Sequence, residues 1–591
     1  MILLITNHSL NLTIITFILF TGLVGLITWY LTRKDSHDSS KGYFLGGRTL
    51  TAAFIAGSLM LTNLSTEQLV GLNGAAFTHG LSVMAWEIIA AISLVIMALF
   101  FLPRFLRSGI ATVPQFLEVR FNKSTRKITS LIFIFSYTII LLPLILYTGA
   151  TGMINILNLE RLLGLEFKTC LIVVIILIGI IGSVYAIFGG LKSVAVSDTL
   201  NGIGLLIGGL SISYFALKHI GNEKSLFESL RIVQDKIPEH FNSISKPEGN
   251  VPFFTLFSGV FLLNLFYWCT NQQIIQRTFG ATNLAEGQKG VLIAGMLKIL
   301  APLILVLPGL LCYYMYVTDQ IILPISQSGS PIADHAYGTL VQKVMPGWMT
   351  GFFAAVLLGA ILSSFNSALN STCTLYSLDI YKGIIRTDAS EDMIIQSSKK
   401  FGWGIALLSM IFAPLLIGQD SIFGYLQAMN AIYFVPVFAV VLIGLTSKRI
   451  PAYAANTGMI FAFTVIVIVY FFPGCNITDV NSDIYLIHNF HFIALVFLFT
   501  LVLIISLGKL KPLKEIWVHK YSGEVDMTPW KFAYPMSISL ILCVIAIYIS
   551  YANISVIGST NLIDKITALS FTGGIIFAIF KLYLISKKLN D

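Results

Sequence analysis

Charged residues are scarce in this sequence. Of its 591 residues, 11% are Asp, Glu, Lys or Arg, whereas 56% are hydrophobic. Soluble globular proteins carry about 25% charged residues, so the composition excludes that class. We therefore predict a polytopic membrane protein.

Clustered cysteines and a basic stripe are also missing. The six cysteines are scattered, mostly inside apolar runs, and no CxxC pair or metal-ligand spacing occurs. The formal charge is +9, but Lys and Arg lie in short loops between apolar runs, as cytoplasmic loops do. We predict no disulfide, no cofactor, no metal other than a coupling ion, and no nucleic-acid partner.

The sequence has no stretch outside its apolar runs that is long enough for a separate soluble domain. The longest loops are about 218–251 and 318–346. The only close histidine pair, His488 and His491, lies at the edge of an apolar run, and no nucleophile-base pair is evident. We therefore predict that the protein is not an enzyme.

Long apolar runs are what the sequence does contain. We count fifteen that are long enough to cross a bilayer, with fourteen as the alternative. They lie near 9–32, 51–76, 79–103, 130–156, 167–188, 193–217, 252–276, 288–317, 347–376, 401–418, 422–446, 453–473, 484–508, 533–552 and 562–584.

The loop charges predict the orientation of these runs. The first run has no basic residue before it and is followed by Arg33 and Lys34, which favours an outside N-terminus. Alternate loops after it carry the excess of Lys and Arg, as cytoplasmic loops should. An odd number of spans then places the C-terminus in the cytoplasm.

Two of the apolar runs are interrupted by polar residues. The stretch Leu61–Gln68 interrupts run 51–76, and Asn264–Gln273 interrupts run 252–276. Short hydroxyl side chains can bond back to their own helix, but Asn63 and Gln68 cannot be hidden that way, and hydrocarbon offers no hydrogen bonds. Five spans separate the interruptions, which predicts an inverted repeat with two broken helices that meet around a solute.

Isolated polar residues in other runs add to this constellation. Glu87, Lys298 and Gln427 supply donors and acceptors within apolar surroundings, and Tyr267 offers a flat apolar face. Such a set suits a small neutral polyol or sugar. The alternatives are that Lys298 snorkels to the interface and that Gln427 makes a helix-helix hydrogen bond.

Adjacent hydroxyls occur in run 347–376, at Ser363 and Ser364. With carbonyls released by an unwound helix, they would give the hard, neutral oxygen ligands that a dehydrated sodium ion accepts. Close packing through small residues, common in membrane helices, is the alternative.

Four stretches carry a resemblance to a known family. Thr62–Phe77 with Glu87, the stretch from Asn264 to Thr278, Ala285–Gly290 and Ser363–Tyr381 resemble the sodium/solute symporter family. They are most similar to its sodium/glucose and sodium/galactose cotransporter branch, which includes bacterial putative symporters. The resemblance covers roughly residues 40–450. It implies the inner membrane of a bacterium as the location.

The resemblance implies an all-α LeuT-type fold with two inverted repeats of five helices. The implied regions are 1–40 for a peripheral helix and loop, 41–220 and 221–450 for the repeats, and 451–591 for C-terminal peripheral helices. The implied sodium ligands are the carbonyls of Leu61, Leu64 and Ala360 and the hydroxyls of Ser363 and Ser364. The implied substrate contacts are Gln68, Glu87, Asn264, Tyr267, Lys298 and Gln427. The implied gate is Leu72, Trp86 and Phe423, and Asp198 is implied on the inner ion pathway.

Two departures from the family pattern bear on the substrate. A polar contact of the sugar family falls on Ala90, and an amide is expected near Leu141. The sequence therefore predicts sodium-coupled symport of a small neutral solute by alternating access, with a sugar as the favoured class. A sodium symporter for a polyol, sialate or amino acid, a channel and a sodium-independent sugar uniporter remain the alternatives.

Overall fold

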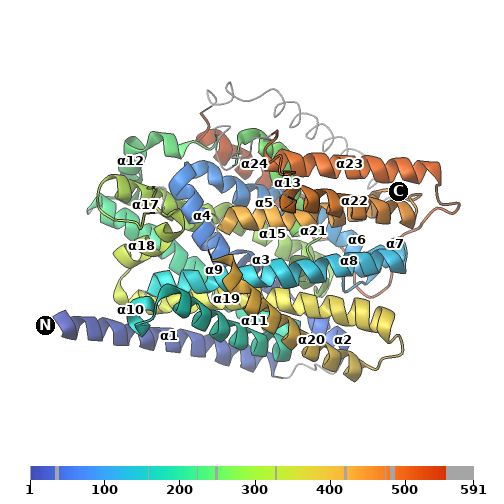
Figure 1. Ribbon diagram of the computed structural model, residues 1–591, viewed down its shortest axis with the longest axis horizontal. Helices are drawn as coiled ribbons and strands as arrows, with labels where there is room; N and C mark the ends of the chain where they lie inside the picture. The colour runs from blue at the N-terminus through green and yellow to red at the C-terminus, as the bar shows by residue number, and fades with distance from the viewer. Residues whose placement is uncertain are drawn as a thin grey trace.

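The computed structural model describes residues 2–33, 39–157, 159–222, 224–245, 251–325, 329–417, 422–472, 474–478 and 486–553. These residues are almost entirely helical and form no β-strand, only isolated bridges such as that between Leu50 and Ala281. Most of the long helices lie side by side in a bundle (Figure 1). The predicted all-α class is confirmed.

The first interrupted run folds as two helices, α3 (Ala52–Asn63) and α4 (Thr66–His79). Leu64 between them has ψ 59°, and Ser65 is extended with φ −86° and ψ 175°. The Ser65 N–H bonds the Asn63 carbonyl at 2.8 Å, which ends the helical hydrogen-bond pattern. The interruption predicted over Leu61–Gln68 is confirmed.

The second interrupted run folds as α13 (Gly259–Cys269) and α14 (Gln272–Phe279). Thr270, with φ −141° and ψ −8°, and the extended Asn271 separate them. All eight residues of α14 are buried, although most of them are polar. The interruption predicted over Asn264–Gln273 is confirmed, and α14 must find hydrogen-bond partners inside the bundle.

The chain between the two interruptions forms further helices. They are α5 (Ala85–Ile96), α6 (Leu102–Ser108), α7 (Val113–Arg120), α8 (Lys123–Ser136), α9 (Leu142–Leu157) and α11 (Phe167–Gly221). The long α11 corresponds to two predicted runs and is broken at Gly190, whose φ of 63° favours glycine.

The helices after the second interruption continue the bundle. They are α15 (Leu284–Leu300), α16 (Pro302–Leu305), α17 (Leu307–Val317), α19 (Gly347–Thr374), α20 (Glu391–Phe412) and α21 (Ile422–Thr446). The chain bends by 42° between α15 and the segment Pro302–Val317. The continuous α19 packs against both α11 and α3. The short helices are α2 (Ser40–Leu45), α10 (Leu159–Leu163), α12 (Leu226–Lys236) and α18 (Ala336–Val344).

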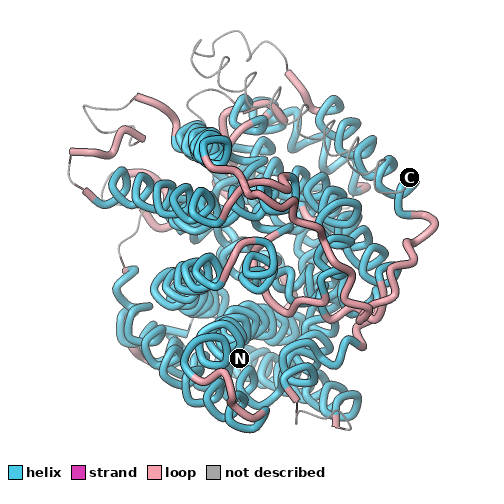
Figure 2. Tube along the Cα trace, turned by 90° about the vertical axis from the view of Figure 1, so that its right-hand side faces the viewer, coloured by secondary structure: helices cyan, strands magenta, loops and turns pink. Residues whose placement is uncertain are grey.

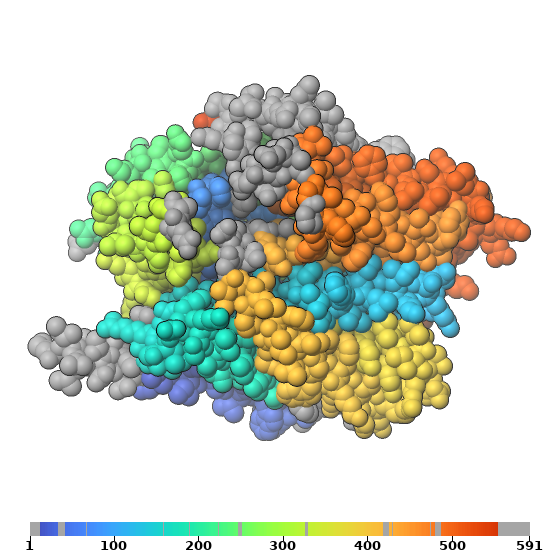
Figure 3. Space-filling model, viewed as in Figure 1, coloured from blue at the N-terminus to red at the C-terminus, as the bar shows by residue number. Residues whose placement is uncertain are grey.

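The first and last helices lie at the periphery. The first, α1 (Ile2–Thr32), packs against α19 and α11. At the opposite edge lie α22 (Ala452–Phe471) and α23 (Asn489–Leu510), drawn in orange in Figure 3, which pack around α21. The last described helix, α24 (Ala533–Ser550), packs against α5 and α15.

The segment 511–532, here called the strap, joins α23 to α24. It lies at the right-hand end of Figure 1, the end that faces the viewer in Figure 2. Its backbone bonds that of Arg449, Lys448, Arg107 and Leu284 at 2.9 to 3.1 Å. The strap therefore ties together the ends of helices that are far apart in the sequence.

The described residues contain most of the predicted runs as helices that could cross a membrane. Eleven helices are long and apolar enough to cross a membrane, or up to twelve if the bent pair Leu284–Val317 is one span. The broken runs contribute the shorter apolar helices α3 and α13. The last predicted run, 562–584, lies outside the described residues, so the count of fifteen stays a prediction.

Candidate functional site

A cavity lies where the two broken helices meet. About 660 Å³ of space within it is not filled by atoms, a figure that includes open solvent. The six predicted substrate contacts all line it, together with Trp86 from the predicted gate. Its lining is Thr62, Asn63, Gln68, Trp86, Glu87, Ala90, Leu141, Leu263, Asn264, Tyr267, Trp268, Asn271, Gln273, Lys298, Leu426, Gln427, Asn430, Tyr433 and Phe434.

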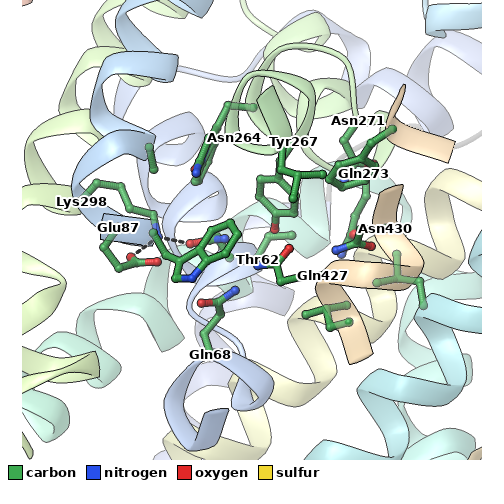
Figure 4. A pocket seen from close by; sticks show the side chains of 18 of the residues that line it. Thr62, Gln68, Glu87, Asn264, Tyr267, Asn271, Gln273, Lys298, Gln427 and Asn430 are labelled. Carbon is green, nitrogen blue, oxygen red and sulfur yellow. Dashed lines mark hydrogen bonds and ion pairs between the residues drawn. The ribbon is translucent and has the colours of Figure 1, made fainter. Parts of the chain in front are cut away.

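A buried ion pair forms one end of the cavity. Lys298 of α15 donates to Glu87 of α5 and to the side-chain oxygen of Asn63 at the end of α3 (Figure 4). The lysine side chain is 0% exposed and the glutamate side chain 3% exposed. Lys298 therefore does not snorkel, and its charge is neutralised inside the protein.

Three amides reach the cavity from different helices. Gln68 comes from α4, Asn264 from α13 and Gln427 from α21 (Figure 4). Asn264 donates to its own helix at the Val260 carbonyl, 3.1 Å away, and Gln68 Oε1 is buried without a partner among the described residues. Amides with unused oxygens or N–H groups can bind hydroxyl groups, which donate and accept.

The rest of the lining is aromatic and apolar. Tyr267 and Trp268 contact each other edge-on with ring centroids 5.2 Å apart, and Tyr267 lies 6.4 Å from Phe434. Ala90 and Leu141, where the family pattern would have polar contacts, both line the cavity. The pocket thus combines a few polar groups with an apolar wall, as binding sites for small solutes do.

The predicted sodium ligands lie at the end of α3, in the break after it, and on α19, which contacts α3. Because α3 ends at Asn63, carbonyls of its last turn, including that of Leu61, lack partners within the helix. Leu64 belongs to the break itself. Ser364 donates its hydroxyl to the Thr62 carbonyl at 3.3 Å, which joins α19 to the end of α3.

The remaining two predicted ligands sit in regular helix. Ser363 is buried, and Ala360 lies one turn earlier. The helix α19 is continuous through both, so the Ala360 carbonyl remains at its normal place in the helical hydrogen-bond pattern. In this region, hydroxyls and helix-end carbonyls provide neutral oxygen atoms close together.

Asp198, predicted on an ion pathway, lies in a buried ion pair beside this region. Its carboxylate accepts from Ser58 of α3 at 2.7 Å and lies 3.5 Å from Arg277 of α14. Arg277 also donates to the Gln273 carbonyl and the Ser367 hydroxyl. The network therefore joins α11, α3, α14 and α19, and it contains an arginine that the sequence argument did not select.

The predicted gate residues Leu72, Trp86 and Phe423 lie on α4, α5 and α21. Trp86 lines the cavity, and its ring contacts Phe490 edge-on with centroids 5.3 Å apart. Leu72 of α4 is buried away from the lining. Phe423 lies in α21, but its side chain is outside the described part of the structure.

Several lining residues were not selected from the sequence. Asn271 lies in the break of the second interrupted helix and Gln273 follows it, while Asn430 and Tyr433 lie on α21. Asn430 follows Gln427 by three residues, so both share one helix face. That spacing is the signal that would have found it.

Comparisons of the sequence with known proteins point to one family. The family model for the Sodium:solute symporter family matches residues 43–462. The uncharacterized symporter YidK of Escherichia coli K12 is 40% identical over 547 residues, which cover 92% of this chain and 91% of that protein. The sodium/glucose cotransporter of Vibrio parahaemolyticus is 32% identical over 481 residues, which cover 79% of this chain and 87% of that protein.

A solved structure shows the fold. The substrate-bound, outward-open structure of a Na⁺-coupled sialic acid symporter matches with a TM-score of 0.70 at 19% identity, over 85% of this chain and 99% of that chain. The predicted LeuT-type fold is confirmed by this likeness, while the repeat boundaries at 41–220 and 221–450 stay predictions. The chain is a multi-pass integral membrane protein and belongs to the sodium:solute symporter family.

Proposed function

We propose that this protein is a secondary active transporter that couples sodium influx to the uptake of a small neutral solute, with a sugar as the favoured class. The observation that carries this proposal is the cavity between the two broken helices, lined by all six predicted polar or aromatic contacts. Its polar groups are amides, hydroxyls and one internally neutralised ion pair, a set that suits the hydroxyl groups of a solute better than a net charge.

Sodium has a proposed place next to this cavity. The carbonyls of Leu61, Leu64 and Ala360 and the hydroxyls of Ser363 and Ser364 would hold it between α3 and α19. Gln273 supports a link between the two sites, because its amide lines the cavity and donates to the Ser364 carbonyl at 3.3 Å. Asp198 would then lie on the inner route from this site, held by Arg277.

Coupling follows from linkage between the two sites. If sodium raises the affinity for the solute, the solute raises the affinity for sodium by the same factor. A membrane potential of about 100 mV adds about 2.3 kcal/mol for each sodium ion moved inward, enough for roughly fiftyfold accumulation. We place the N-terminus outside and the C-terminus in the cytoplasm of a bacterial cell, because alternate loops are rich in Lys and Arg.

Uptake into liposomes tests this proposal. Purified protein is given labelled sugars, polyols, sialate and amino acids with and without an inward sodium gradient. We expect one neutral polyhydroxylated solute to accumulate only when sodium is outside. Equal flux without sodium would instead make the protein a uniporter or channel, and uptake of a carboxylate alone would overturn the neutral class.

A matched pair of serine variants tests the sodium site. Ser364→Ala removes the hydroxyl that reaches the Thr62 carbonyl and should abolish sodium-dependent uptake while the protein remains in the membrane. Ser409→Ala is the control, because that buried hydroxyl bonds only its own helix at Ile405, 2.8 Å away. Unchanged uptake by Ser364→Ala would remove this serine from the ion site.

A further inference from the structure

The cavity has a second polar end, opposite the Lys298–Glu87 pair. Asn271, Gln273 and Asn430 lie together there, while Lys298 and Glu87 lie on the other side of Tyr267 (Figure 4). Asn271 lies in the break just before α14, Gln273 lies in the first turn of α14, and Asn430 comes from α21. This end therefore spans one broken helix and a helix that faces it.

Two buried tyrosines fix the orientation of these amides. Tyr137, which is fully buried, accepts the backbone N–H of Gln273 at 3.1 Å and donates its hydroxyl to the side-chain oxygen of Asn271. Tyr433 donates to the side-chain oxygen of Asn430 at 2.9 Å. Because each amide oxygen accepts a tyrosine hydroxyl, each NH₂ group points away from its tyrosine.

The two oriented NH₂ groups have no hydrogen-bond partner within the described chain. An amide nitrogen offers two N–H donors, and those of Asn271 and Asn430 belong to residues that line the cavity. The nearby Gln273 uses its own NH₂ group on the Ser364 carbonyl. This end of the cavity therefore presents donors without a cation.

We propose that Asn271 and Asn430 form a donor pair that binds a neutral acceptor oxygen of the solute, a hydroxyl or ring oxygen at the end remote from Lys298. Tyr137 and Tyr433 are positioning residues that hold this pair. The inference rests on the proposed function and deepens it, since it requires a solute with oxygen atoms at both ends. If the two amides had only a structural role, they would link helices and would not affect solute recognition.

Binding, measured separately from transport, tests the donor pair. The rise in unfolding temperature of purified protein is recorded with glucose, galactose and myo-inositol, with monodeoxy analogues of each and with sialate, all in sodium. We expect one monodeoxy analogue to bind the wild-type protein about tenfold more weakly than its parent, because a hydrogen bond to Asn430 is lost. In Asn430→Ala this analogue and its parent should bind equally well, whereas the other analogues should still bind more weakly than their parents to the same extent as in the wild-type protein.

Tyrosine variants test the positioning role. Tyr433→Phe removes only the hydroxyl and should weaken solute binding about three- to tenfold. Tyr470→Phe is the control, because Tyr470 donates to Asn489 at 2.6 Å in a half-buried tyrosine–asparagine pair between α22 and α23, outside the cavity. The unfolding temperature without solute reports whether each variant folds. If Asn430→Ala does not fold, it is replaced by Asn430→Asp, whose side chain has nearly the same size as asparagine.

Each outcome decides between the two proposals. Equal solute affinity in Tyr433→Phe and Tyr470→Phe, or an unchanged set of deoxy penalties in the Asn430 variant, overturns the donor pair while the transport proposal stands. A wild-type protein that binds no polyhydroxylated solute overturns the donor pair as well. Normal binding with sodium-independent flux overturns the coupling alone.

Discussion

Removing the Glu87 carboxylate should destabilise the protein far more than removing both members of its ion pair. In Glu87→Leu, the Lys298 ammonium stays fully buried and keeps the neutral oxygen of Asn63 and the Trp268 ring, whose centroid is 5.4 Å away, but no counter-charge. An uncompensated buried charge costs about 3–5 kcal/mol, while replacing both partners by apolar residues of similar size is often close to neutral. The single variant should thus lose about two to four powers of ten in its folding equilibrium.

Unfolding of the purified protein in detergent checks this prediction. Glu87→Leu should unfold at a clearly lower temperature or denaturant concentration than the double variant Glu87→Leu/Lys298→Met, although both should lose uptake. Glu391→Leu is the control, because its pair with Lys382 is 3.4 Å long and both side chains are more than 40% exposed, so its loss should cost about 0–1 kcal/mol. If the single and double variants unfold alike, or if Glu87→Leu costs no more than Glu391→Leu, the reasoning is refuted.

Two further predictions concern packing and pH. Gly259→Ala should lower stability or alter the start of α13, because its Cβ would lie 2.0 Å from the Phe490 carbonyl oxygen. Gly404→Ala is the control and should be tolerated, because its Cβ would have no atom within 4 Å. Equal unfolding temperatures of the two variants would contradict this prediction. In the strap, burial and then the charges of Arg107 and Arg104 lower the pKa of His519 to about 4. Near pH 6.5 the unfolded chain therefore binds a proton on His519 that the folded chain does not bind. The free energy of unfolding should fall as pH drops from about 7 to about 4. His519→Gln should flatten that part of the stability curve, and an unchanged slope would exclude His519 as its source.

The sequence was sufficient to locate the breaks in the two central helices. Polar clusters inside apolar runs are unusual enough that Leu61–Gln68 and Asn264–Gln273 marked the breaks at Leu64 and at Thr270. Gln427 was recognisable for the same reason, as an amide in an apolar run. These residues were detectable because hydrocarbon makes each buried polar group expensive.

The partners of these residues could not be predicted from the sequence. Glu87 and Lys298 were both selected as solute contacts, but nothing in their spacing shows that they neutralise each other. The pairing of Asp198 with Arg277 likewise depends on how α11 and α14 pack. Pairing between helices is set by their rotation and depth in the bundle, which apolar periodicity does not fix.

The strap lies beyond the part of the chain that the family pattern covers, but it contacts residues inside that part. The family match ends at residue 462, yet the Trp517 indole donates to the Val119 carbonyl at 3.1 Å and Glu524 lies 3.5 Å from the Arg48 guanidinium. A peptide linker outside the region of the family match thus contacts the segment that leads into the first broken helix. Any relative that diverges beyond α22 must hold that segment in another way, and a reporter inserted within 511–532 would weaken these contacts.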